Sequence, residues 1–152
     1  MTKIIQSAIL ADRGTNRSDP FNTLIADYVA RTSRYSPCET QLFDMEATFL
    51  QAMGKQAGRT PAYLVMLDSR GKQLTSEELA EAIARVRDSG IQRMVFAIGP
   101  ADGWSVNARD QANLLLSFGR ITLPHQLARV VLAEQVYRAF TILAGHPYHS
   151  GH

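Results

Sequence analysis

The chain has 152 residues, 45% of them hydrophobic and 20% charged, with 16 basic side chains against 14 acidic ones. This composition is ordinary for a globular protein and predicts a single domain, residues 1–152, large enough to bury its own core. It excludes a protein that coats nucleic acid by charge alone, and no apolar run approaches the roughly 20 residues of a membrane span.

The first half of the chain alternates short and long apolar patterns. Residues 3–10 read as a strand, too short an apolar stretch for a secretory signal. A helix is expected to begin at Pro20, a favourable opening residue. Residues 39–43 predict a second strand and residues 46–57 a helix. The apolar side chains that share one face of the helix beginning at Pro20 are Phe21, Leu24, Ile25, Tyr28 and Val29.

The only cysteine, Cys38, follows Pro37 in a turn-like stretch. One cysteine excludes an internal disulfide and favours a reducing compartment, so we expect a cytoplasmic protein. No histidine stands beside it in the sequence, and we interpret it as a small buried residue rather than a nucleophile.

The second half repeats the alternation. Residues 62–68 form a continuous apolar run, typical of a strand covered on both faces. The next helix has a capping box of Thr75 and Glu78 and a stop at Gly90. A strand over 91–99, a helix over 105–119, a brief strand over 120–124 and a closing helix from about 124 to 144 follow. Strands alternating with helices predict an α/β fold, with a mostly parallel sheet flanked by helices.

Apolar residues spread around most of the circumference of the closing helix. A helix that covers only one side of a sheet needs a narrower apolar stripe. A second copy of the chain, packed on this helix, would cover the extra face. A helix wholly buried within one chain is the competing account.

Two loops that contain glycine follow predicted strands, residues 67–72 and 98–105, and a third glycine-containing segment, residues 117–126, surrounds the last predicted strand. Ligands of parallel sheets gather at the carboxyl ends of strands, so these loops are the candidate site. The stretch "GPADG" lacks the spacing of a dinucleotide fingerprint. Asp68, Asp102 and Asp110 suit caps and turns better than paired-carboxylate catalysis.

The chain closes with "AGHPYHSGH", and His146, His149 and His152 are spaced by three. Such spacing suits a zinc site on a helix, but Pro147 would break that helix. Alternatively, Tyr148 and His149 form an amphipathic tip that contacts a base and a phosphate. A frayed, idle end is the simplest reading of the tail.

The stretch "LLLSFGRITLPHQLARVVLAEQVYRAF", followed by "HPYH", closely resembles the SPOUT methyltransferases that modify pseudouridine in bacterial large-subunit ribosomal RNA, the rRNA large-subunit methyltransferase H family. The match is dense over residues 98–149, looser over 67–80 and faint at the N-terminus. Where the family has two adjacent glycines this chain has Gly99 and Pro100. Ser150 stands in place of a frequent basic residue, and residues 11–14 lack the family's Gly-Lys turn.

The resemblance implies a SPOUT fold, in which the C-terminal part of the α/β domain is threaded into a trefoil knot. It also implies a homodimer that acts on ribosomal RNA or the ribosome, without a membrane, and a cofactor, S-adenosylmethionine, held in the knot. No metal is implied. The residues that match the family's cofactor site are Leu67, Gly99, Phe118, Gly119, Arg120, Ile121, Thr122 and Leu123.

Tyr148 and His149 match the family's catalytic tail, which reaches the partner's cofactor pocket and helps to place the target nucleotide. His125 and Arg129 match residues that support the pocket or the RNA. The resemblance therefore predicts methyl transfer from S-adenosylmethionine to N3 of a pseudouridine in 23S ribosomal RNA. A catalytically idle RNA- or ribosome-binding relative is the alternative, and a metal-binding module built on the tail histidines is a third hypothesis.

Overall fold

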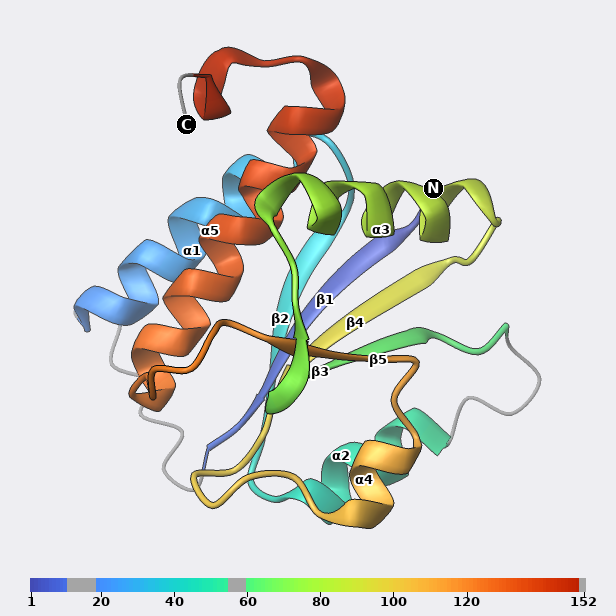
Figure 1. Ribbon diagram of the computed structural model, residues 1–152, viewed down its shortest axis with the longest axis vertical. Helices are drawn as coiled ribbons and strands as arrows, with labels where there is room; N and C mark the ends of the chain where they lie inside the picture. The colour runs from blue at the N-terminus through green and yellow to red at the C-terminus, as the bar shows by residue number, and fades with distance from the viewer. Residues whose placement is uncertain (11–18, 55–59, 151–152) are drawn as a thin grey trace.

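The computed structural model describes residues 1–10, 19–54 and 60–150. In these ranges five strands form one sheet in the order β2-β1-β4-β3-β5, and every pair of neighbours runs parallel (Figure 1). The predicted parallel α/β architecture is confirmed. The strands are β1 (Lys3–Ile9), β2 (Cys38–Phe43), β3 (Tyr63–Gln73), β4 (Arg93–Ile98) and β5 (Leu114–Ser117).

Helices cover both faces of the sheet, as Figure 1 shows. One face carries α1 (Pro20–Thr32), α3 (Ser76–Asp88) and α5 (His125–Ala144), and the other carries α2 (Glu46–Gly54) and α4 (Val106–Asp110). A one-turn 3-10 helix, η1 (Pro147–His149), follows α5. No helix in the ranges described above is long and apolar enough to cross a membrane.

Successive side chains of the central strands point to opposite faces of the sheet and pack into two separate cores. On β4, Met94 and Phe96 point into the core beneath α3 and α5, whereas Val95 and Ala97 point into the core beneath α2 and α4. All four side chains are fully buried. A strand covered on both faces needs apolar residues at every position, and this explains the unbroken apolar run.

Local capping explains where two helices begin. The Thr75 hydroxyl accepts the Glu78 amide while the Glu78 carboxylate accepts the Thr75 amide, so the predicted capping box is present. Gly90 beyond the end of α3 has a φ of +78°. At α1, Asp19 caps the amide of Phe21, one residue after Pro20 opens the helix.

The prediction for residues 105–119 was wrong. Only Val106–Asp110 is helical, and Leu114–Ser117 forms β5 rather than the end of a helix. The Asn113 side chain accepts the Leu64 amide and the Asn113 amide donates to the Leu64 carbonyl, at 2.7 and 2.8 Å. These bonds draw the chain onto the edge of β3. The strand expected over 120–124 is absent, and these residues form a loop.

The segment after the apolar part of β3 combines strand and loop. Leu67 and Lys72 both pair with Leu116 of β5, so residues 68–71 bulge out of the ladder. The loop predicted over 67–72 is therefore an interruption within an extended strand. Residues 11–14, where the family's Gly-Lys turn is missing, lie outside the described residues, and so does the end of the helix predicted over 46–57.

Most of the circumference of α5 is buried within its own chain. Leu132, Val136 and Phe140 pack in the core shared with the sheet and α3, and Tyr137 packs against Tyr28 of α1. The breadth of the apolar face thus follows from burial between α1, α3 and the sheet. Burial within one chain, the competing account, is therefore enough to explain the breadth, and a partner subunit on this helix stays a prediction. On α1 and α5, the large apolar side chains that stay exposed are Phe21, Leu24 and Leu127, by 37%, 46% and 38%.

Replacing Gly71 by alanine is expected to disrupt the bulge. A Cβ there would lie 2.5 Å from the backbone carbon of Leu115 on β5, closer than real contacts allow. We expect Gly71→Ala to lower the free energy of unfolding by about 1–3 kcal/mol. Gly54→Ala is the matched control, because its Cβ would meet nothing within 4 Å. Urea unfolding measures both, and equal stability of the two variants would contradict the proposed clash.

Candidate functional site

A cavity of about 580 Å³ opens at the carboxyl ends of β3, β4 and β5. It is bounded by the bulge after Leu67, the loop that begins at Gly99, and the segment that links β5 to α5. This is the edge at which open parallel sheets bind ligands. The three glycine-containing loops singled out in the sequence therefore meet around one space.

The structure brings every residue of the predicted cofactor set to this cavity. These residues come from segments up to 56 positions apart in the sequence, counted from Leu67 to Leu123. The predicted members that line it are Leu67, Gly99, Phe118, Gly119, Arg120, Ile121, Thr122 and Leu123.

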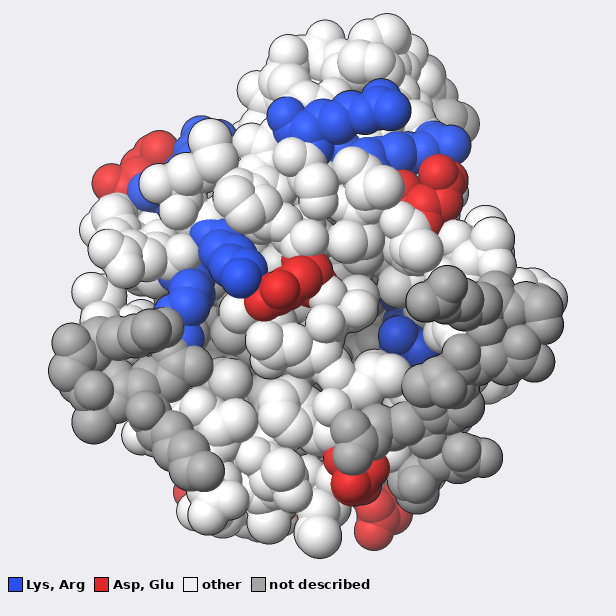
Figure 2. All heavy atoms as spheres, turned by 180° about the vertical axis from the view of Figure 1, so that it is seen from behind, with Lys and Arg blue, Asp and Glu red and all other residues white. Residues whose placement is uncertain are grey.

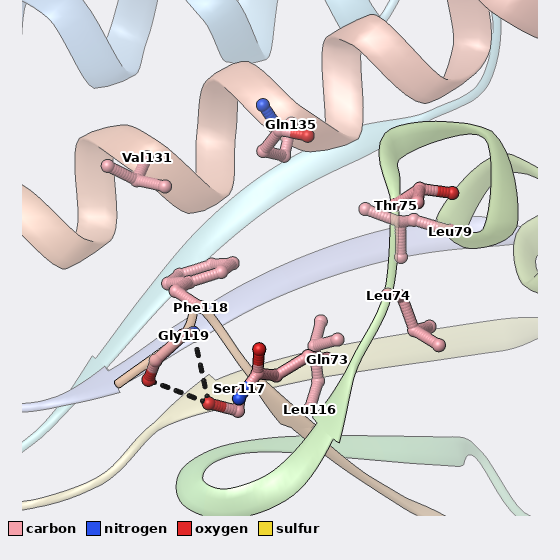
Figure 3. Close-up of a pocket in the computed structure, with 10 residues that line it drawn as sticks. All are labelled: Gln73, Leu74, Thr75, Leu79, Leu116, Ser117, Phe118, Gly119, Val131 and Gln135. Atoms are coloured by element: carbon pink, nitrogen blue, oxygen red, sulfur yellow. Dashed lines mark hydrogen bonds between the residues drawn. The ribbon is translucent and has the colours of Figure 1, made fainter. Parts of the chain in front are cut away.

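A tight turn shapes the wall after β5. The Ser117 hydroxyl accepts the Gly119 amide and donates to the Gly119 carbonyl, both at 3.0 Å (Figure 3). Gly119 has a φ of +111°, which strains any residue with a Cβ. The turn therefore depends on glycine, and it leaves the backbone open to close approach by a ligand.

A second, smaller cavity of about 290 Å³ adjoins the same turn (Figure 3). It shares Leu116, Ser117, Phe118 and Gly119 with the first cavity, and its other walls come from the start of α3 and the middle of α5. The side chains that line it are uncharged, whereas Asp68, Arg70 and Arg120 are among those around the first cavity. The charged character of the first cavity fits a charged ligand better.

His125 joins the start of α5 to the end of β4. Its Nε2 contacts the carbonyl oxygen of Gly99, and the side chain lines the large cavity. Pro100 is accommodated in this loop, because its carbonyl accepts the amide of Gly103 at 2.8 Å and closes a turn. The predicted role of His125 in supporting the pocket is compatible with this position.

Asp68 belongs to the architecture of the bulge. Its carboxylate accepts the amide and the guanidinium of Arg70, at 2.8 to 3.0 Å. The hydrogen bonds from Arg70 hold the pKa of Asp68 below its ordinary value. Since both oxygens are engaged by Arg70, Asp68 closes a turn, as the sequence indicated, and is poorly placed as a general base.

Arg129 lies away from the cavity that His125 lines. It is 8% exposed and points from α5 toward α1, where it donates to Gln126 at 2.9 Å and to Asn22 at 3.3 Å. Burial lowers the pKa of its guanidinium. The position ties the two helices together, and a contact of Arg129 with RNA stays a prediction.

The tail is folded against α5 and α3. The Tyr148 ring packs on Tyr137 at 4.8 Å between centroids, and the Arg138 guanidinium lies 4.9 Å from the centre of the Tyr148 ring. The Tyr148 hydroxyl donates to Glu134 at 3.2 Å. Burial, with hydrogen bonding, raises the pKa of Tyr148 well above its ordinary value. The phenol therefore stays protonated near neutral pH.

Both ring nitrogens of His149 are engaged. Arg138 donates to Nδ1 at 2.8 Å, and Nε2 contacts the Glu77 carboxylate on α3. A guanidinium only donates, so Nδ1 is the acceptor and Nε2 carries the proton in the neutral ring. The hydrogen bond from His149 lowers the pKa of Glu77. The simplest reading of the tail as a frayed end does not fit residues 144–150, which make these contacts.

The tail follows the C-terminal end of α5 (Figure 1), whereas the residues of α5 that border the cavity, His125 and Ala128, lie at its N-terminal end. His125 borders the cavity, and Arg138, which holds the tail, stands 13 residues later. At a rise of 1.5 Å per residue, the two are about 20 Å apart along the helix axis. One chain therefore does not place its own Tyr148 and His149 at its own large cavity.

The described residues offer no group of three or more His, Cys, Asp or Glu side chains suited to hold a metal ion. His146 accepts the Tyr148 amide through Nδ1, and His149 is engaged by Arg138 and Glu77. His152, the third member of the hypothetical zinc set, lies outside the described residues.

Trp104, which borders the cavity, was missed in the sequence. It is the only tryptophan of the chain and stands in a loop directly after a buried strand. A lone large aromatic residue between glycine-rich turn residues was the signal that could have marked it.

Cys38 is expected to react slowly with alkylating reagents. Burial raises the pKa of its thiol to about 11, and its sulfur accepts a weak hydrogen bond from Gln6. Since the thiolate is the reactive form, we expect iodoacetamide at pH 8 to modify the folded protein on the order of 100-fold more slowly than the urea-unfolded chain. Equal rates, followed by mass spectrometry, would show that the thiol is not protected.

Comparisons with known proteins agree on one family. A family model described as a predicted SPOUT methyltransferase matches residues 8–149. A ribosomal RNA large subunit methyltransferase H from Koribacter versatilis is 48% identical over 139 residues, 91% of this chain and 94% of that protein.

Two solved structures share the fold. A probable methylase family protein from Haemophilus influenzae matches with a TM-score of 0.58 and 11% identity, over 95% of this chain and 67% of its own. The SpoU methyltransferase AviRb from Streptomyces viridochromogenes, in complex with the cofactor AdoMet, matches with a TM-score of 0.50 and 12% identity. The match covers 90% of this chain and 57% of the AviRb chain.

Proposed function

The chain belongs to the SPOUT methyltransferase family, and on this basis we propose that it transfers a methyl group from S-adenosylmethionine to N3 of a pseudouridine in large-subunit ribosomal RNA. The observation that carries the proposal is the cavity that gathers Leu67, Gly99 and residues 118–123 at one edge of the sheet. The K. versatilis protein is named for methylation of large-subunit ribosomal RNA, and AviRb was solved with AdoMet.

The cavity fits such a cofactor in size, backbone access and apolar lining. Its volume of about 580 Å³ lies within the roughly 300–1,000 Å³ of small-molecule sites. Gly119 has open space where a Cβ would stand, so a ligand can approach its backbone closely, and Leu67, Phe118 and Leu123 supply apolar walls. When bound, S-adenosylmethionine supplies a methyl group on a positively charged sulfur, which makes that methyl a good electrophile.

The protein's share of the chemistry is positioning and proton removal. We assign Tyr148 to holding the target base, because its phenol stays protonated and acts as a donor. His149 is the better candidate to accept the N3 proton, once the base displaces Arg138 from Nδ1. Holding the N3 atom and the methyl group in line removes about 7–11 kcal/mol of the barrier to methyl transfer.

A homodimer would bring the tail and the cavity together. Two copies packed antiparallel along α1 and α5 would set the tail of one beside the large cavity of the other, because these features lie toward opposite ends of α5. The open apolar side chains Phe21, Leu24 and Leu127 lie in the first two turns of these helices, and a second copy would cover them. In this arrangement each partner completes the other's site.

Recognition of the substrate relies on shape more than on net charge. The formal net charge is only +2. Figure 2 shows Lys and Arg side chains mostly toward the end of the molecule that carries the C-terminal segment, with Asp and Glu among them. Charge-driven binding would be weak and sensitive to salt. We therefore propose a structured site on the ribosome in the cytoplasm as the substrate, in preference to free RNA.

The proposal predicts both cofactor binding and methyl transfer. Isothermal calorimetry should give a dissociation constant below about 1 mM for S-adenosylmethionine, which corresponds to roughly 4 kcal/mol of binding free energy. Ribosomes from cells that lack the endogenous enzyme should gain one methyl group on a pseudouridine, read by mass spectrometry of the RNA. Ribosome binding without cofactor binding would instead favour the catalytically idle relative.

The roles of the tail predict separable effects. His149→Ala should lower the rate of methyl transfer by about 10²–10⁴-fold, and Tyr148→Phe by less, because general-base loss is the larger effect. Both variants should bind S-adenosylmethionine as the unmodified protein does. His146→Asn keeps an acceptor for the Tyr148 amide and is the control, with unchanged transfer. Full-rate transfer by both tail variants would refute the assignment.

Sharing of the site predicts complementation between two inactive chains. Gly119→Val should block the cofactor cavity, since the φ of +111° disfavours a β-branched residue. Mixed with His149→Ala chains, it should restore roughly a quarter of the activity, since half of randomly assorted dimers hold one intact site of two. Heterodimers shown by mass spectrometry to form, yet without activity, would contradict a shared site.

A further inference from the structure

Trp104 lies at the junction of two strand ends that wall the large cavity. Its side chain is 3% exposed. The indole Nε1 donates to the Leu67 carbonyl at 3.1 Å, where β3 leaves the sheet. Leu67 pairs with Ile98 on the neighbouring strand, directly before Gly99. One ring therefore touches the end of β3 and lies beside the end of β4.

The same indole occupies the space that a side chain at position 99 would need. An ideal Cβ on Gly99 would lie 2.7 to 2.9 Å from three atoms of the five-membered part of the ring. Gly99 is not one of the glycines with a positive φ, so its backbone conformation alone does not require glycine. The requirement for glycine comes from Trp104, whose ring fills the space beside the Gly99 backbone at the cavity wall.

The ring is fixed from behind by α2 and α4. Phe49 of α2 packs on it at 5.5 Å between centroids. Arg109 donates to the Trp104 carbonyl at 2.7 Å, and the Glu46 carboxylate accepts the amide and hydroxyl of Ser105 at 2.8 and 2.7 Å. The indole is therefore held through its Nε1, through an aromatic contact and through the backbone of its own loop.

We propose that Trp104 is a positioning residue that sets the spacing between the Leu67 carbonyl and the Gly99 backbone, and so the fit of the cofactor's adenosine part. The inference rests on the proposed function, because the ligand it concerns is S-adenosylmethionine. Trp104 acts through the two walls and takes no part in proton transfer. Its removal should therefore weaken cofactor binding before it affects the chemistry at the tail.

Trp104→Phe removes the indole N–H and keeps an aromatic ring. We expect the dissociation constant for S-adenosylmethionine, measured by calorimetry, to rise about 10-fold, because the freed Leu67 carbonyl no longer has a fixed position. Ile5→Val on β1 is the matched control. It thins the same core cluster and keeps Phe49, Trp104 and both strand segments at the cavity wall, so it should lower the melting temperature and leave the dissociation constant within about 2-fold.

A double-variant cycle tests the coupling of Trp104 to Gly99 directly. Gly99→Ala should weaken S-adenosylmethionine binding about 10-fold or more in the unmodified chain, and less than about 3-fold when Trp104→Leu has already made room. Additive effects would overturn the inference. So would an Ile5→Val loss of affinity as large as that of Trp104→Phe, since general softening of the core would then explain both. Failure of the unmodified chain to bind S-adenosylmethionine would instead refute the proposed function.

Discussion

The pairing of β3 with both β4 and β5 is the constraint on which the rest of the molecule depends. Leu67 pairs with Ile98 on one side and Leu116 on the other, so β4 and β5 end beside the residue at which β3 begins its bulge. The bulge of residues 68–71 then turns the chain away from the ladder and leaves an opening above those ends. Each wall of the large cavity follows from this register, since a shift of one residue would turn every side chain to the opposite face.

Helix α5 connects the parts of the molecule that the proposed function brings together. Its first residue, His125, contacts the end of β4, its middle fills the core beneath α1 and α3, and Arg138 near its end holds the tail. The helix keeps cavity and tail apart within one chain. The same rigidity makes the geometry of a pair of chains predictable, because an antiparallel packing would place each tail at a fixed distance from the opposite cavity.

Local signals in the sequence predicted most elements well. The capping box at Thr75, the stop at Gly90 and the apolar runs of β3 and β4 depend on neighbours within a few residues, and all three were confirmed. The helix predicted over residues 105–119 was wrong because Asn113 forms a hydrogen bond with Leu64, a partner 49 positions away that no local pattern reveals. The cofactor set came from family resemblance. Its convergence on one cavity depends on topology, and Trp104 was missed because its contacts are long-range.

Burial of the only indole in the chain has a practical consequence for spectroscopy. Trp104 is surrounded by Phe49, the Gly99 backbone and the ends of two strands, with almost no contact with water. Its emission should lie at short wavelength in the native protein and move to the red on unfolding. Because no second tryptophan adds background, any quenching on adding a nucleoside would report on this one wall, and the molecule carries its own optical probe of occupancy.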